Sequence, residues 1–293
     1  MEQLATSVEN SDQEKPRKRF TYHDNSLPDH PVIFETFAEG ILQADGKFMK
    51  ETGIDPMQQS NIGCVVEDVL EIGRQEFEKF QKEYLDKEGI SLAEYGERLE
   101  EGVYRAYCEE LGLTESMLAG KKVLDIGSAE SFFASYCLKR GISDTVYSVD
   151  GGESSYIDQE VKKVIWSEEV KKGVEGKTKK TLMQELPYEE GSFDLVIILA
   201  ALPGRDKEFR GKLTLEQDID QSYDEILRVL ASGGEARIAS FSGDENDEYF
   251  GAWYKATKKK LQEFSQREGI TVIFEDIPGQ EGQRIILRKE IEQ

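Results

Sequence analysis

The pattern of apolar and polar residues divides the chain into a helical first part and a second part in which strands and helices alternate. In residues 21–118, apolar side chains recur every three or four positions with acids and lysines between them, which predicts two amphipathic helices, Ile62–Leu85 and Leu92–Leu111. A shorter helix is predicted around Phe34–Leu42. From Val123 onward, short apolar runs alternate with helical stretches, which is typical of an α/β fold with a parallel sheet.

Six apolar runs in this second part predict strands. They are Val123–Ile126, Thr145–Asp150, Phe193–Leu199, Glu235–Phe241, Ile270–Ile277 and Gln283–Lys289. Helices are expected at Ser154–Val174, Leu213–Leu230 and Asp247–Arg267, with a lysine-rich exposed loop over Lys171–Lys180. The last two strands flank a PGQEG turn and therefore predict a hairpin.

The same pattern predicts three regions. Residues 1–20 are polar and lack the apolar core of an export signal, so we expect a disordered lead and a cytoplasmic protein. The helices of residues 21–118 need a surface to cover, and the open end of the sheet offers one, which predicts a helical cap. Residues 119–293 would then form the domain that carries the binding site.

Charge and composition argue against several classes of partner. The chain has 37 basic and 59 acidic residues, a net charge of -22 that repels a phosphate backbone, so we expect no nucleic acid. The longest apolar run, Leu195–Pro203, is too short to cross a bilayer, so no membrane partner is expected. Cys64, Cys108 and Cys137 are widely spaced and are interpreted as reduced core thiols, and no metal site is predicted.

The stretch KKVLDIGSAES at Lys121–Ser131 indicates a binding site. Its strand ends at Gly127, where the backbone turns into a helix without a side chain in the way. Asp150 ends the next strand, where a carboxylate can accept both hydroxyl hydrogens of a ribose. The dinucleotide fingerprint is broken at Ala129 and Phe132, and Glu130 would repel a pyrophosphate. A nucleoside without phosphates fits this turn better.

These residues resemble the first motif of class I S-adenosylmethionine-dependent methyltransferases, and two later stretches, ELPYEEGSFDLVIILAAL and EILRVLASGGEARIASF, resemble the family's fourth and fifth strands. The resemblance implies a Rossmann-like methyltransferase sheet with an antiparallel C-terminal edge, a third strand near Thr181–Met183, and S-adenosylmethionine as cofactor. The residues it implies for cofactor binding are Asp125, Gly127, Ser128, Ala129, Asp150, Gly151, Gln184, Glu185 and Ala200. The sequence departs from the family at Ala129 and Ser131, which replace glycines, and at Leu182, which replaces an acid.

The acceptor side of the site is less clearly marked. Methyl transfer needs positioning more than a nucleophile, so no catalytic residue is assigned, and His23 is the candidate base. Candidate acceptor contacts are Tyr22, Arg105, Tyr107 and Arg205. Three hypotheses stay open: a methyltransferase with a small-molecule acceptor, a degenerate member that only binds or regulates, and a methyltransferase acting on protein or RNA.

Overall fold

In the computed structural model of the chain, the described residues all belong to one unit, Glu67–Gln293. They are residues 74–75, 77–151, 156–199, 201–203, 213–241, 246, 251–279 and 282–291. The predicted lead and most of the predicted cap lie outside these residues. Within the described ranges, no helix is both long and apolar enough to cross a membrane.

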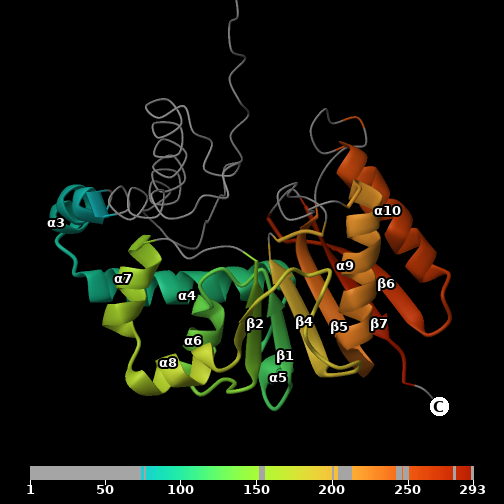
Figure 1. The fold of residues 1–293 in the computed structure, drawn as a ribbon, viewed down its shortest axis with the longest axis horizontal. Coiled ribbons are helices and arrows are strands. Elements are labelled where there is room, and N and C mark those ends of the chain that lie inside the picture. Colours follow the sequence, from blue (N-terminus) through green and yellow to red (C-terminus); the bar gives the residue numbers. More distant parts are fainter. Residues whose placement is uncertain are drawn as a thin grey trace, which may run out of the picture. The chain divides into compact units, whose positions relative to one another are not determined.

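A seven-stranded sheet forms the centre of the unit (Figure 1). Its strand order is β3-β2-β1-β4-β5-β7-β6; the pairs from β3 to β5 are parallel, and β7 runs antiparallel to both of its neighbours, β5 and β6. The strands are β1 (Val123–Ile126), β2 (Val146–Asp150), β3 (Thr178–Lys180), β4 (Phe193–Leu199), β5 (Leu230–Phe241), β6 (Ile270–Asp276) and β7 (Gln283–Lys289). The order reverses between β1 and β4, so a crevice is expected where these two neighbouring strands end. The predicted fold class is confirmed, including the antiparallel C-terminal edge.

Helices cover both faces of this sheet (Figure 1). They are η1 (Gln81–Leu85), α3 (Asp86–Glu88), α4 (Leu92–Leu111), α5 (Glu115–Leu118), α6 (Phe132–Lys139), α7 (Tyr156–Ile165), α8 (Glu168–Glu175), α9 (Leu215–Val229) and α10 (Gly251–Ser265). Helices α4, α5, α6 and α8 contribute to the core on one face, and α9 and α10 to the core on the other.

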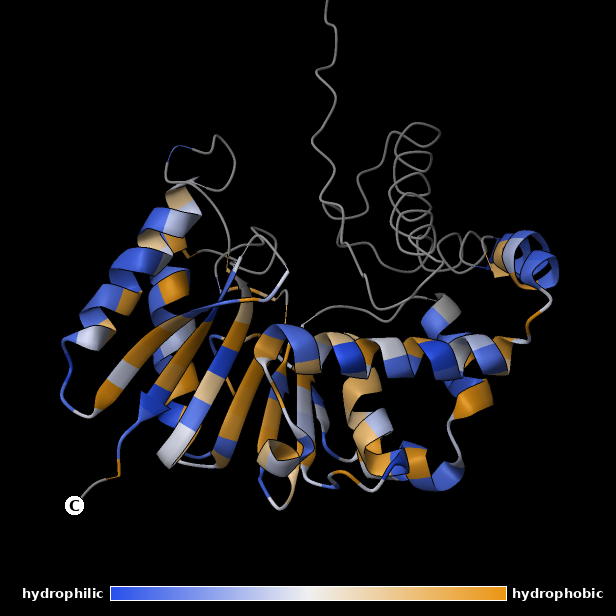
Figure 2. Cartoon of the chain, turned by 180° about the vertical axis from the view of Figure 1, so that it is seen from behind, coloured by the Kyte–Doolittle hydropathy of each residue, from blue (hydrophilic) through white to orange (hydrophobic). Residues whose placement is uncertain are grey.

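Alternation along the strands assigns each side chain to one of the two cores. In β1, Leu124 and Ile126 join the α9 and α10 side, whereas Val123 joins the α4 and α6 side. Figure 2 shows the strands mostly in the hydrophobic colour and the helices with mixed faces. Because both faces of β1 are buried, its sequence is a continuous apolar run interrupted only by Asp125.

Helix α4 packs on the same face of the sheet as α6. The Ser91 side chain caps its first turn by accepting from the Glu94 backbone N–H at 3.1 Å, and Gly112 ends it at a φ of 63°. Its last carbonyls are bound by two buried arginines of the sheet. The Arg237 guanidinium donates to the Leu111 carbonyl at 2.8 Å, and that of Arg284 to the Glu110 carbonyl at 3.3 Å.

The prediction of an exposed loop over Lys171–Lys180 is wrong. Helix α8 continues to Glu175 because Val170 and Val174, one turn apart, bury their side chains against the α6 side of the core. Strand β3 then occupies Thr178–Lys180, three residues earlier than the strand implied by the resemblance. As the sheet's edge strand it leaves its lysines exposed, which hid it from an apolar pattern.

Candidate functional site

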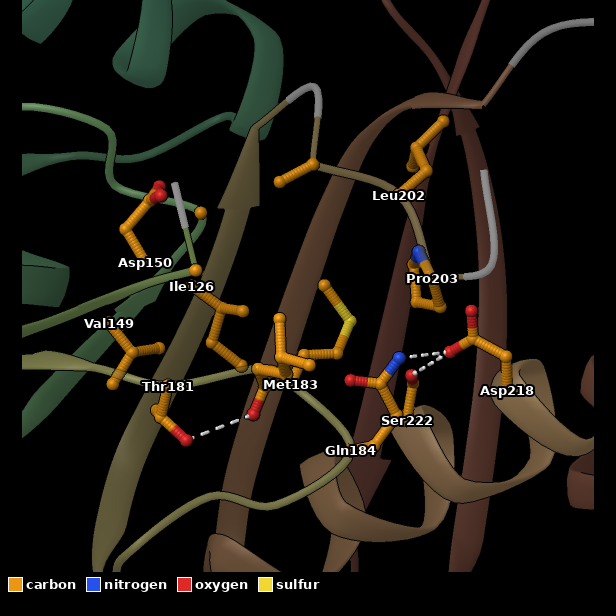
Figure 3. Close-up of a pocket in the computed structure, with 14 residues that line it drawn as sticks. Ile126, Val149, Asp150, Thr181, Met183, Gln184, Leu202, Pro203, Asp218 and Ser222 are labelled. Atoms are coloured by element: carbon orange, nitrogen blue, oxygen red, sulfur yellow. Dashed lines mark hydrogen bonds between the residues drawn. The ribbon is translucent and has the colours of Figure 1, made fainter. Parts of the chain in front are cut away.

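A pocket opens at the carboxyl ends of the parallel strands, as the reversal of strand order predicts (Figure 3). It is bordered by the ends of β1 and β2, by the turn after β3, by the segment after β4 and by the first turns of α9. The lining residues are Ile126, Gly127, Val149, Asp150, Gly151, Thr181, Leu182, Met183, Gln184, Ala201, Leu202, Pro203, Asp218 and Ser222.

Gly127 forms the base of this pocket by bringing two loops into close approach. Its φ is 72°, in the left-handed region, and a Cβ added there would lie 2.0 Å from the Cβ of Ala201. Its N–H donates to the Val149 carbonyl at 2.8 Å, which holds the turn against β2. Position 127 therefore needs a glycine for the turn, as the sequence indicated, and also for the close approach of Ala201.

The loop after Gly127 contains two strained residues. Ala129 has a φ of 45° and Ser131 a φ of 59°, at the positions where the resembling family has glycines. The Ala129 N–H donates to Oδ2 of Asp150 at 2.7 Å, and the Ser131 N–H donates to the Ser128 carbonyl at 2.9 Å. The loop thus keeps a glycine-type path without the glycines, at a cost on the order of 1 kcal/mol for each residue.

Ala129→Gly is expected to stabilise the protein by about 1 kcal/mol, because glycine adopts this φ without the Cβ clash that alanine suffers. Urea unfolding of the wild type and the variant measures the change. Ala119→Gly is the matched control, since Ala119 is also exposed but has an ordinary φ of -61°. A loss of stability at both positions would contradict the assignment of strain to Ala129.

Asp150 gives the pocket a carboxylate at the end of β2. Of its two oxygens, Oδ2 already accepts from the Ala129 N–H, which fixes the orientation of the side chain at the pocket wall. Each carboxylate oxygen has two lone pairs, so the group can still accept hydrogens from a ligand's hydroxyls. This is the position in which the sequence predicted a ribose acceptor.

The opposite end of the pocket carries a second polar group of residues. The carboxylate of Asp218, from the first turn of α9, is 1% exposed. Its Oδ1 accepts from the Gln184 side-chain Nε2 and from the Ser222 hydroxyl, the latter at 3.1 Å (Figure 3). Between the two polar ends the walls are mainly apolar, formed by Ile126, Val149, Leu182, Met183, Leu202 and Pro203. A ligand with two polar ends and an apolar middle matches this lining.

Asp125 lies on the other face of the sheet from the pocket. Strand alternation turns its side chain away from Ile126 and toward α4, where the buried Tyr107 hydroxyl donates to Oδ1 at 3.0 Å. Burial raises the pKa of Asp125 to about 8, helped by the charge of Asp150 and opposed by the Tyr107 hydrogen bond. Burial also raises the pKa of Tyr107 well above its ordinary value.

The other predicted site residues are dispersed. Ser128 is buried, with its hydroxyl 3.5 Å from the Val149 carbonyl, and Gly151 lines the pocket. Glu185 is exposed and is not among the lining residues, and Arg105 pairs with Glu101 one turn away on the surface of α4. Four residues lie outside the described part of the chain: Tyr22, His23, Ala200 and Arg205.

Three polar lining residues were missed by sequence reasoning: Thr181, Asp218 and Ser222. The first stands just after β3, which the sequence placed too late. Asp218 and Ser222 lie one turn apart in α9, beside the buried Ile219, yet a polar residue in an amphipathic helix is normally assigned to the solvent face. Their one-turn spacing along an apolar stripe is the signal that could have revealed them.

The charge of the lining restricts what the pocket can hold. It has two carboxylates, Asp150 and Asp218, and no lysine or arginine among its described lining residues. No cluster of three or more His, Cys, Asp or Glu side chains suited to a metal occurs in the described ranges. A cationic ligand that carries hydroxyls suits this wall better than a phosphate does.

One known protein family matches part of this chain. Residues 124–238 match a family described as a methyltransferase domain. No curated protein matches the chain.

Several solved structures are similar to part of this chain at low sequence identity. An S-adenosylmethionine-dependent methyltransferase from Aquifex aeolicus is 16% identical, with a TM-score of 0.35, and the match covers 66% of this chain and 89% of that one. A Corynebacterium glutamicum protein is 14% identical, with a TM-score of 0.43 and coverage of 66% and 90%. A Pyrococcus horikoshii protein is 16% identical, with a TM-score of 0.42 and coverage of 64% and 91%.

Proposed function

Residues 124–238 belong to the methyltransferase domain family of class I S-adenosylmethionine-dependent enzymes, and on that premise we propose that the chain methylates a small-molecule acceptor. S-adenosylmethionine is the cofactor of this domain. The observation that best supports the proposal is the pairing, in one pocket, of the Gly127 turn with the carboxylate of Asp150.

The pocket suits this cofactor in shape and charge. Asp150 can accept from the ribose hydroxyls, and the apolar walls can enclose the flat faces of the base. The cofactor supplies a methyl group on a positively charged sulfur, and the two carboxylates of the lining attract that charge. The Glu130 carboxylate, which the sequence predicted to repel a phosphate, is buried in an ion pair with Lys162 and is not among the residues that line the pocket.

Residues of the chain would act by positioning. When bound, the cofactor would supply the methyl group, and residues of the chain would hold the acceptor atom in line with the carbon–sulfur bond and exclude water. The segment Ala201–Pro203 lines this pocket directly after β4, so we propose that it contacts the acceptor. His23, Tyr22 and Arg205 stay candidates for the same role.

The overall charge favours a small acceptor over RNA. A net charge of -22 opposes the approach of a polyanion, and the pocket lining described above adds no positive charge. An RNA or protein acceptor is the alternative that acceptor assays would detect. The second candidate function, a module that binds the cofactor without turnover, is favoured by one observation: Leu182, with no hydrogen-bonding group, lines the pocket where the family has an acid.

Asp150→Ala is expected to weaken S-adenosylmethionine binding by about 1 to 3 kcal/mol, because two ligand hydroxyls lose their acceptor. Isothermal titration calorimetry of the full chain measures the dissociation constant. The substitution also frees the Ala129 N–H, so a thermal melt has to show that the variant is folded.

Asp144→Ala is the matched control, since Asp144 is an exposed aspartate before the opposite end of β2. It removes the same charge and should leave the affinity unchanged. Wild-type protein that binds no S-adenosylmethionine would refute the proposed function, whereas equal affinity in the Asp150 variant would only remove Asp150 from the ribose site. Binding without methyl transfer to any acceptor would favour the non-catalytic module.

A further inference from the structure

An ion pair joins the loop after Gly127 to helix α7. We propose that this pair, between Glu130 of the loop and Lys162 of the helix, positions the Asp150 carboxylate for the cofactor by holding the loop in a path that glycines would otherwise provide. The inference rests on the proposed function, since it assumes that Asp150 accepts the ribose hydroxyls of S-adenosylmethionine.

The first step is the strain in the loop. Ala129 and Ser131 stand on either side of Glu130, and their φ angles of 45° and 59° lie in a region that side chains rarely adopt. Ser131 stands at the N-terminus of α6, yet its side chain makes no capping hydrogen bond there. Residues in such conformations persist only where surrounding contacts hold them. Glu130 lies between the two, and its contacts can provide that support.

The second step is the burial of the anchor. The Glu130 side chain is 9% exposed, and its carboxylate accepts from the Lys162 ammonium. That ammonium also lies over two aromatic rings, 5.2 Å from the ring centre of Trp166 and 5.9 Å from that of Phe132. Trp166 in turn donates from Nε1 to the buried Glu100 carboxylate of α4 at 2.9 Å. Lys162 therefore has a defined position from which it can hold the loop.

The third step joins the anchor to the pocket. Ala129, the residue next to Glu130, donates its N–H to Oδ2 of Asp150 at 2.7 Å. This hydrogen bond orients the carboxylate at the pocket wall. If the loop leaves its strained path, the bond is lost and the carboxylate can turn to water. The affinity for the cofactor then falls in proportion to the fraction of molecules whose loop is in place.

The test measures the binding of S-adenosylhomocysteine, the demethylated cofactor, to the full chain by calorimetry. Lys162→Met removes the ammonium and leaves a buried carboxylate that has to move to water, taking the loop with it. We expect the affinity to fall about tenfold, since two strained residues lose their support. Glu130→Ala releases the loop without leaving a buried charge, because the Lys162 side chain is 21% exposed and can reach water. It should weaken binding in the same way.

Glycine substitutions separate positioning from a purely structural role. In the double variant Ala129→Gly with Ser131→Gly, the backbone adopts positive φ angles without strain, so the ion pair is no longer needed to impose them. Adding Lys162→Met to this background should lower the affinity by less than about threefold. The matched control is Lys163→Met, because the exposed Lys163 pairs with Glu160 within α7 and should bind the ligand like the wild type when replaced. Thermal melts show whether each variant is folded.

Each outcome decides the matter. A loss of affinity in Lys162→Met that the two glycines reduce, with Lys163→Met like the wild type, supports the proposal. A folded Lys162→Met that binds like the wild type overturns it and leaves the proposed function intact, even if the melting temperature falls. A loss that the glycines leave unchanged, or an equal loss in Lys163→Met, also overturns it. If Lys162→Met does not fold, Glu130→Ala takes its place with and without the glycines. Wild-type protein that binds no S-adenosylhomocysteine overturns the inference together with the proposed function.

Discussion

Gly127→Ala will abolish measurable cofactor binding and lower the stability of the domain. The new Cβ would stand 2.0 Å from the Cβ of Ala201, far inside contact distance, and alanine would also be held at a φ of 72°. One of the two loops has to move, and both line the pocket. We expect a loss of about 2 to 4 kcal/mol in unfolding free energy, the sum of backbone strain and overpacking. Urea unfolding and calorimetry with S-adenosylmethionine measure the two effects.

Two comparisons separate strain from collision. Gly120 has nearly the same backbone conformation, with a φ of 69°, but a Cβ there meets nothing within 4 Å. Gly120→Ala should therefore show the strain alone, about 1 kcal/mol, with cofactor binding unchanged. The double variant Gly127→Ala with Ala201→Gly removes the colliding atom and should recover part of the lost stability. A double variant no better than Gly127→Ala would show that the collision is not the cause.

Asp125→Asn is expected to become more stable than the wild type as the pH rises. Burial raises the pKa of Asp125 to about 8, whereas in the unfolded chain it is about 4. The folded state therefore holds the proton more tightly, and the wild type loses stability between those two values because the carboxyl ionises in the unfolded chain while it stays protonated in the folded protein. Asparagine resembles the protonated acid and does not ionise. Unfolding free energies measured from pH 5 to pH 9 should diverge in favour of the variant until about pH 8.

The groups around Asp125 set the controls for this measurement. Tyr107 donates to its Oδ1, and the charge of Asp150 acts on it from the end of β2. Asp144→Asn removes an exposed carboxylate from the loop before β2 and should follow the wild-type profile. Parallel profiles for Asp125→Asn and the wild type would mean that this carboxyl is already ionised at neutral pH in the folded protein.

Sequence periodicity predicted most of the fold because most elements have an apolar face. The boundaries of Leu92–Leu111 and Gln283–Lys289 are confirmed to the residue. Strand β3 was misplaced because it is an edge strand with exposed lysines, and its place comes from pairing with β2. Apolar pattern alone contains no information about such a pairing.

Sequence reasoning named Gly127 and Asp150 at one end of the pocket, and at the other end it named Gln184 but not Asp218 or Ser222. Gly127 and Asp150 follow directly after apolar strands, so their positions at the strand ends could be inferred along the chain. Asp218 comes from a helix far along the sequence, and its distance from Gln184 depends on how α9 packs against the sheet. For Asp125 the resemblance implied a contact with the cofactor. Strand alternation instead turns its side chain toward α4, where it binds the Tyr107 hydroxyl. The boundary between cap and domain near residue 118 stays a prediction.

The two arginines that bind the end of α4 have a consequence for the order in which the protein can fold. Arg237 follows its partner Leu111 by 126 positions, and Arg284 follows its partner Glu110 by 174. While the chain is being synthesised, α4 leaves the ribosome long before either guanidinium exists, and its terminal carbonyls are bonded only to water. Contacts of such sequence separation form late and slow the folding of a chain. The end of α4 is therefore expected to bind the sheet only after the last strand has left the ribosome. A chain stalled on the ribosome before residue 284 should still be cleaved by proteases.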